Sequence, residues 1–187
     1  NLSIQYKDFA LWQRNYLNGK QLETQLKYWK VQLSGYEQLN LLTDKPRPSK
    51  INYAGSSIIF DIDIKTSKEL RELAKELNVS LYTVLLSAYY LMLRAYSNQN
   101  DIIIGSPISN RHIGQVENLI GFFVNVLPLR VVIDPEVSII QYVQAVGEIV
   151  INAQMQQDLP FEKLVNELNL LKDTSQHPIF QVIFGLE

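Results

Sequence analysis

Residues 101–130, DIIIGSPISNRHIGQVENLIGFFVNVLPLR, decide the fold of this chain. The β-branched run 102–104 ends at Gly105 and Pro107, a pattern typical of a strand that is buried on both faces. A second apolar run, 122–132, predicts another strand. The loop that joins the two runs collects most of the unusual polar residues. We therefore expect the rest of the chain to hold this stretch in place.

The unusual polar side chains of this stretch are Asn125 in the second run and, in the loop, Ser106, Ser109, Asn110, Arg111 and His112. By residue type His112 is the better acid–base candidate, whereas a lone loop histidine is more often simply an exposed side chain. Asn125 lies inside the second apolar run, where a carboxamide without partners costs a few kcal/mol. It must therefore have either a satisfied structural bond or a role that faces a ligand. Ser106 follows a glycine in a turn-like sequence, but no pattern fixes a histidine base beside it, so we interpret it as structural.

Working outward, hydrophobic periodicity and turn residues predict about six helices and four strands in mixed order. The run 57–65 alternates like a half-exposed strand, with Asp61 and Asp63 on its wet side as solvated charges. Thr66 with Glu69 resembles a capping box. Ser80 and Ser138 are expected N-caps. The predicted helices are 6–16, 22–33, 66–77, 81–96, 139–157 and 161–168, and the predicted strands are 57–65, 102–104, 122–132 and 179–186. This predicts one α/β domain, a layered sandwich with a mixed sheet.

Composition excludes several classes of function. The net charge is −2 and the basic residues are scattered, so we expect no nucleic-acid partner. No apolar run reaches the roughly 18 residues that span a bilayer, so we expect no membrane partner and a cytoplasmic protein. The chain has no cysteine and two histidines, far apart, which removes thiolate chemistry and predicts no metal site. Both ends lie inside structured patterns, so we expect a piece of a larger protein.

Four motifs in order resemble those of the condensation domain of nonribosomal peptide synthetases. They are 6–12 (YKDFALW), 120–130 (IGFFVNVLPLR), 156–162 (QQDLPFE) and 172–181 (KDTSQHPIFQ). The sequence departs from the family motifs in places: Gln156 replaces a histidine, and Lys172 and Gln176 replace arginines. The order and spacing of the motifs hold from end to end, so the resemblance covers essentially the whole chain.

The resemblance implies a chloramphenicol-acetyltransferase-like fold, in which two lobes enclose a tunnel, and it implies that residues 1–187 form the C-terminal lobe. The family joins donor and acceptor aminoacyl thioesters carried on phosphopantetheine arms, which would be substrates and not bound cofactors. Its His-His-x-x-x-Asp-Gly motif belongs to the N-terminal lobe and is absent from this sequence. We therefore expect no catalytic residue in this chain, and no activity from the chain alone.

The resemblance also implies roles for individual residues. Asn125 and Ser106 would face the tunnel, and Arg111 and Arg130 would pair with a carboxylate of the other lobe. An alternative for Arg130 is a surface charge at a strand end. Residues 106–115 resemble the segment that floors the tunnel, and 156–162 the segment that latches the lobes. Within the latch, Asp158, Pro160 and Phe161 would be structural.

Three interpretations remain open at this point. The chain is half of an active condensation domain, or a non-catalytic partial domain that serves as a platform for a neighbouring adenylation domain, or part of an epimerisation or heterocyclisation domain. The implied partners are the N-terminal lobe, peptidyl carrier proteins and the adenylation domain. An exposed apolar face is expected where the other lobe would lie, and without that lobe it could drive dimerisation.

Overall fold

A computed structural model describes residues 3–169 and 173–186 of the chain. Lys172 of the fourth motif lies outside the described residues. The described part contains six α-helices, a short 3-10 helix and one pair of strands. The helices are α1 (Tyr6–Tyr16), α2 (Gly19–Gln32), α3 (Ile64–Glu76), α4 (Leu81–Ser97), α5 (Ile139–Gln154) and α6 (Phe161–Glu167), with η1 at Gly114–Val116; the strands are β1 (Asp101–Ile108) and β2 (Asn125–Val132).

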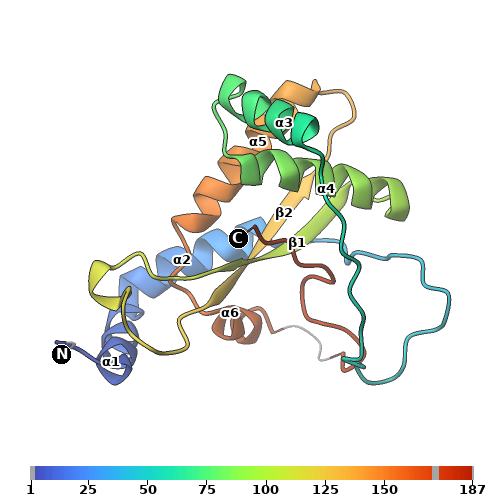
Figure 1. Cartoon of the computed structure of the whole chain (residues 1–187). Helices are drawn as coiled ribbons and strands as arrows, with labels where there is room; N and C mark the ends of the chain where they lie inside the picture. The colour runs from blue at the N-terminus through green and yellow to red at the C-terminus, as the bar shows by residue number, and fades with distance from the viewer. Residues whose placement is uncertain (1–2, 170–172, 187) are drawn as a thin grey trace.

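The two strands pair antiparallel over eight positions, from Asp101 opposite Val132 to Ile108 opposite Asn125. Figure 1 shows α3, α4 and α5 gathered on one side of the pair and α6 on the other. Ile102, Ile103 and Ile104 are each no more than 1% exposed. The prediction of a strand buried on both faces is confirmed there, because helices and the C-terminal segment cover both sides.

The C-terminal segment adds a parallel neighbour to β1. Gly105 donates its backbone N–H to Val182 O and accepts from Phe184 N, each at 2.9 Å, and Ile183 forms a single parallel bridge with Gly105. The prediction of a full last strand over 179–186 is therefore wrong in extent: only the backbone around Ile183 bonds to β1. The mixed character expected of the sheet is present, with antiparallel and parallel contacts on the two edges of β1.

The predicted strand at 57–65 is wrong. Residues 36–63 contain no helix or strand in the structure, and Ile58, Ile59 and Phe60 are 77–92% exposed. No described strand lies beside this segment to bond its backbone, and alternation alone cannot supply one. The segment is the long connection that runs out around one side of the molecule in Figure 1.

The start of α3 also differs from the expectation. Asp63, not Thr66, is the N-cap, and its carboxylate accepts from Thr66 N at 2.9 Å and from the Thr66 hydroxyl at 2.7 Å. Both hydrogen bonds lower the pKa of Asp63, and the bond from the backbone N–H of Thr66 has the larger effect. Asp63 is thus a capping residue and not merely a solvated charge. Ser80 and Ser138 cap α4 and α5 as predicted.

The apolar residues form one large core and a smaller cluster. The large core lies around the strand pair, and the small cluster joins α1 to the loop before β2 through Phe9, Val116, Leu119 and Phe123. No single described helix is long and apolar enough to cross a membrane; α3 and α4 meet that test only as a pair bent by 106°.

Gly105 gives a direct test of this packing. A Cβ at Gly105 would lie 2.6–2.8 Å from ring atoms of Phe180, which is 2% exposed and has little room to move. We expect Gly105→Ala to lower the free energy of unfolding by about 1–3 kcal/mol through overpacking. Urea denaturation measures the change.

Gly114→Ala is the matched control, because nothing lies within 4 Å of the added Cβ. Its stability should be unchanged or slightly raised. Equal urea midpoints for the two variants would show that the packing of Phe180 on β1 does not constrain this position.

Candidate functional site

The best-connected polar side chain of the candidate site is Asn125, the first residue of β2 and 7% exposed. Its Nδ2 donates to Gln157 O and Leu159 O, both at 2.9 Å. Its Oδ1 accepts from Phe161 N at 3.0 Å and Val126 N at 2.9 Å. A carboxamide has two donors and two acceptor positions, so all of them are used. Asn125 thus has satisfied structural bonds, which hold residues 156–161 against the start of β2.

Helix α2 holds the same segment from a second direction. Gln25 is 1% exposed; its Oε1 accepts from Leu159 N at 2.9 Å and its Nε2 donates to Asp158 Oδ2 at 3.1 Å. Trp29 Nε1 donates to Gln156 O at 3.1 Å. Sequence reasoning missed Gln25. The available signal was its place beside Leu26 on the apolar face of α2, where a polar residue needs a partner.

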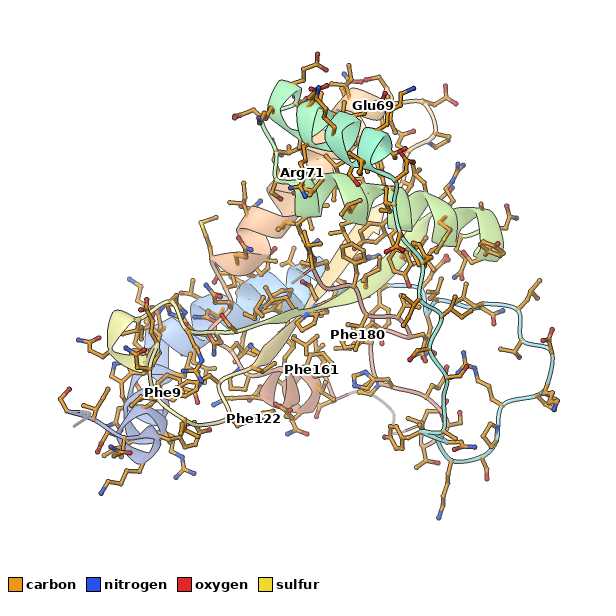
Figure 2. All side chains as sticks on the ribbon, viewed as in Figure 1. Phe9, Glu69, Arg71, Phe122, Phe161 and Phe180 are labelled. Carbon is orange, nitrogen blue, oxygen red and sulfur yellow. The ribbon has the colours of Figure 1, made fainter. Side chains whose placement is uncertain are left out.

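The three predicted latch residues lie within this junction. Asp158 has its second oxygen, Oδ1, 3.1 Å from His112 Nε2. Pro160 is the N-cap of α6, with φ −59°, and Phe161 is its first residue. The Phe161 ring lies 5.2 Å from that of Phe180, centroid to centroid (Figure 2). These contacts fit the structural role predicted for the three residues.

Arg111 makes its hydrogen bonds within its own loop. Its Nη1 lies within hydrogen-bond distance of the carbonyls of Val116, Glu117 and Leu119. Its guanidinium carbon lies 4.2 Å from the centroid of the Phe123 ring, a cation–π contact. Arg111 therefore fixes residues 109–124 from within, and the carboxylate partner predicted for it in another lobe is not needed to hold it.

Arg130 pairs with Asp101 of the same chain. Nε and Nη2 reach the two carboxylate oxygens at 2.8 and 2.7 Å, a bidentate pair with side chains 15% and 14% exposed. Nη1 donates to Gln32 O at 3.1 Å and Ser34 O at 2.7 Å. The hydrogen bond with Asp101 raises the pKa of Arg130, against a smaller lowering by burial. The structure thus makes Arg130 an internal tie between the strands and the end of α2, not a simple surface charge.

Ser106 lies in β1 and is 5% exposed. Its Oγ accepts from the Tyr82 hydroxyl at 2.7 Å. Burial raises the pKa of Tyr82, and the hydrogen bond with Ser106 offsets part of that rise. A phenol of raised pKa is no general base at neutral pH, so this pair gives no support to a nucleophilic Ser106. Both residues line a cavity of about 150 Å³ between α4, α5 and the strands.

The contacts of this site show polar side chains that position one another and the backbone around them. Among residues 3–169 and 173–186, no group of three histidine or acidic side chains could hold a metal ion. The polar groups of the junction are mostly bonded to one another.

Comparisons with known proteins match the whole chain. The model of the Condensation domain family matches residues 1–187. The chain is 46% identical over 182 residues to N-(5-amino-5-carboxypentanoyl)-L-cysteinyl-D-valine synthase of Amycolatopsis lactamdurans, covering 97% of this chain and 5% of the relative. It is 41% identical over 185 residues to malpibaldin synthetase of Mortierella alpina, covering 98% of this chain and 3% of that protein. The chain thus spans only 3–5% of the length of these relatives.

Solved structures of similar proteins show which fold this chain shares. The X-domain from teicoplanin biosynthesis superposes with a TM-score of 0.90 at 25% identity, over 97% of this chain and 42% of that one. A four-domain nonribosomal peptide synthetase bound to AMP and glycine superposes with a TM-score of 0.83 at 29% identity, over 87% of this chain and 12% of that one. The mixed α/β fold expected from the sequence is confirmed.

The Asn125 junction predicts a large effect of one substitution. In Asn125→Leu, the carbonyls of Gln157 and Leu159 and the N–H of Phe161 lose their partner. We expect the free energy of unfolding to fall by about 2–4 kcal/mol, because unpaired buried polar groups keep their desolvation cost. Urea denaturation measures it. Asn152→Leu, on the exposed face of α5, is the control and should change little; a loss as large in the control would refute the explanation.

The geometry of the Arg130–Asp101 pair predicts that a positive charge at position 130 is not enough to keep the stability of the wild-type chain. Arg130→Lys keeps the charge but loses the fork that reaches both carboxylate oxygens and two carbonyls. We expect a loss of about 1–2 kcal/mol in thermal or urea unfolding. Glu69→Gln, which breaks an exposed pair with Lys65 at 3.9 Å, should cost less than about 0.5 kcal/mol. A lysine variant as stable as wild type would show that the fork geometry contributes nothing.

Proposed function

Because this chain belongs to the condensation-domain family of nonribosomal peptide synthetases, we propose that it is the C-terminal lobe of a domain that forms peptide bonds. In that reaction the acceptor amine attacks the carbonyl of a donor thioester, a C–N bond forms, the C–S bond breaks, and the proton passes to the departing thiolate. The observation that carries the proposal is the family match over all 187 residues.

The proposed division of labour follows from what the chain contains. The sequence has no two adjacent histidines and no His-His-x-x-x-Asp-Gly motif. The polar side chains of the candidate site mostly bond to groups of this chain, as Asn125 does to the backbone of 157–159 and Arg130 does to Asp101. A positioned base contributes roughly 10²–10⁴-fold to a rate and orientation more. We therefore propose that this lobe alone is inactive, and that the base comes from the N-terminal lobe.

Exposed apolar side chains support an interface with another lobe. Ile120 and Phe122 are 94% and 75% exposed, next to the Asn125 junction, and Ile58 to Phe60 form a second apolar stretch. Exposed apolar clusters of this kind mark contact surfaces. In the proposed complete domain, residues 106–115 would floor the tunnel, 156–162 would latch the lobes, and Asn125 and Ser106 would lie beside the tunnel.

The proposed partners are the N-terminal lobe, two carrier proteins and an adjacent adenylation domain. The phosphopantetheine arms of the carriers would enter as substrates, so the lobe would hold no cofactor of its own. We propose a cytoplasmic enzyme. The second candidate is a partial domain that packs on an adenylation domain without catalysis; the exposed apolar side chains fit this as well, since such a platform also needs a contact surface.

Reconstitution tests the proposal. The chain is co-expressed with a condensation-domain N-terminal lobe that contains His-His-x-x-x-Asp-Gly, and formation of the dipeptidyl thioester is followed by mass spectrometry with loaded donor and acceptor carriers. We expect product from the pair and none from either half alone.

The control for uncatalysed aminolysis is the same pair of lobes with the second histidine of the His-His-x-x-x-Asp-Gly motif, in the N-terminal lobe, replaced by alanine. Product from this chain without its partner would overturn the division of labour. A stable two-lobe complex without product, or binding to the adenylation domain alone, would favour the platform.

A further inference from the structure

The Asp158 carboxylate is contacted from two sides. Oδ2 accepts from Gln25 Nε2 and Oδ1 lies against His112 Nε2, each at 3.1 Å. An ionised carboxylate only accepts, so His112 must present an N–H there. The side chain of Asp158 is 16% exposed and that of His112 40% exposed. The histidine is thus the partner that can reach both solvent and the carboxylate.

The carboxylate that His112 meets is fixed in advance. Gln25 is oriented because its Oε1 accepts from Leu159 N, which turns its Nε2 toward Asp158. The neighbouring carbonyls of Gln157 and Leu159 are held by Asn125. A preorganised acceptor costs little ordering entropy when its donor arrives, so the contact depends mainly on where His112 lies.

His112 belongs to a different unit from Asp158. Residues 109–124 are held by Arg111 on their own carbonyls and by the small cluster with α1. Residues 156–161 are held by α2 and by Asn125. One direct side-chain hydrogen bond or ion pair joins the loop 109–124 to the segment 156–161 among residues 3–169 and 173–186. It is the contact of His112 with Asp158.

We propose that His112 is a positioning residue that, through Asp158, keeps the loop 109–124 closed against the segment 156–161. Without it the loop keeps its internal bonds but loses this tie, so the two sides of the junction separate more often. The consequence for condensation rests on the proposed function, because both segments would border the tunnel; the contact itself is tested independently of activity.

Hydrogen–deuterium exchange of the full chain measures the contact, with His112→Ala, Asp158→Ala, the double variant and wild type compared. We expect exchange of the amides in 112–119 to rise about 3–10-fold in His112→Ala, as expected for loss of one local tie in a region of low stability. His112→Ala should have no further effect in the Asp158→Ala background, because its partner is gone. His112→Gln, which keeps a donor, should restore part of the protection.

Gln115→Ala is the matched control, an exposed side chain of the same loop, and should exchange as wild type does. Unchanged exchange in His112→Ala, or equal effects of His112→Ala in both backgrounds, would overturn the proposal. Equal exchange in His112→Gln and His112→Ala would also count against it, since side-chain bulk would then explain the result and not the donor.

Activity of the two-lobe protein measures the consequence. We expect His112→Ala to lower kcat/KM for loaded carriers about 3–10-fold, in proportion to the population of the open loop, and His112→Gln to lie in between. An inactive wild-type pair would defeat the proposed function and leave the exchange result standing. An active pair with wild-type kinetics in His112→Ala would remove the positioning role even if the contact is confirmed.

Discussion

The register of β1 against β2 is the constraint on which the other contacts depend. Arg130 lies opposite Ile103, which makes Asp101 its diagonal neighbour on the same face of the pair. Asn125 lies at the other end of β2, roughly 17 Å away at the usual rise per residue. A slip by one residue would turn both side chains to the opposite face. One register thus sets the internal ion pair and the carboxamide junction together.

Helix α2 shows how far this constraint reaches. Its middle residues, Gln25 and Trp29, bond to the segment 156–161, and the carbonyl of Gln32 at its end accepts from Arg130. The helix is therefore tied to β2 directly at its C-terminal end and through the segment 156–161 at its middle. Neither tie alone would fix its rotation, but two ties along one helix leave it little freedom to turn or slide.

The sequence predicts those features that depend on neighbours close along the chain. The caps at Ser80 and Ser138 and the buried run 102–104 need only local pattern, and the structure agrees. The error at 57–65 has the opposite cause: a strand needs a second strand to bond, and alternation does not say whether one is there. Asp63 falls within that expected strand, so the pattern gives no sign of its capping role.

The polar contacts can be predicted only in part, because they join residues distant in sequence. Asn125 stands out because a carboxamide among apolar residues requires partners, but nothing local says that they are backbone groups 32–36 residues away. Arg130 has the pattern of a charge available to another lobe or to solvent. Its partner within this chain, Asp101, comes into reach only through the strand register, which the sequence alone does not state.

The way the polar groups are used limits what this chain can contribute to a reaction. Asn125 and Arg130 direct their hydrogen bonds to groups of their own chain, and breaking those bonds to bind a substrate would leave buried groups unpaired. Such side chains can hold the backbone around them in one shape, but they are not free to take up or release a proton. The partly exposed His112 differs, since one of its ring nitrogens meets Asp158 while the side chain stays 40% accessible. A side chain that can still change its hydrogen-bond partner is therefore found at the exposed edge of the junction, at His112, and not at its buried centre, at Asn125.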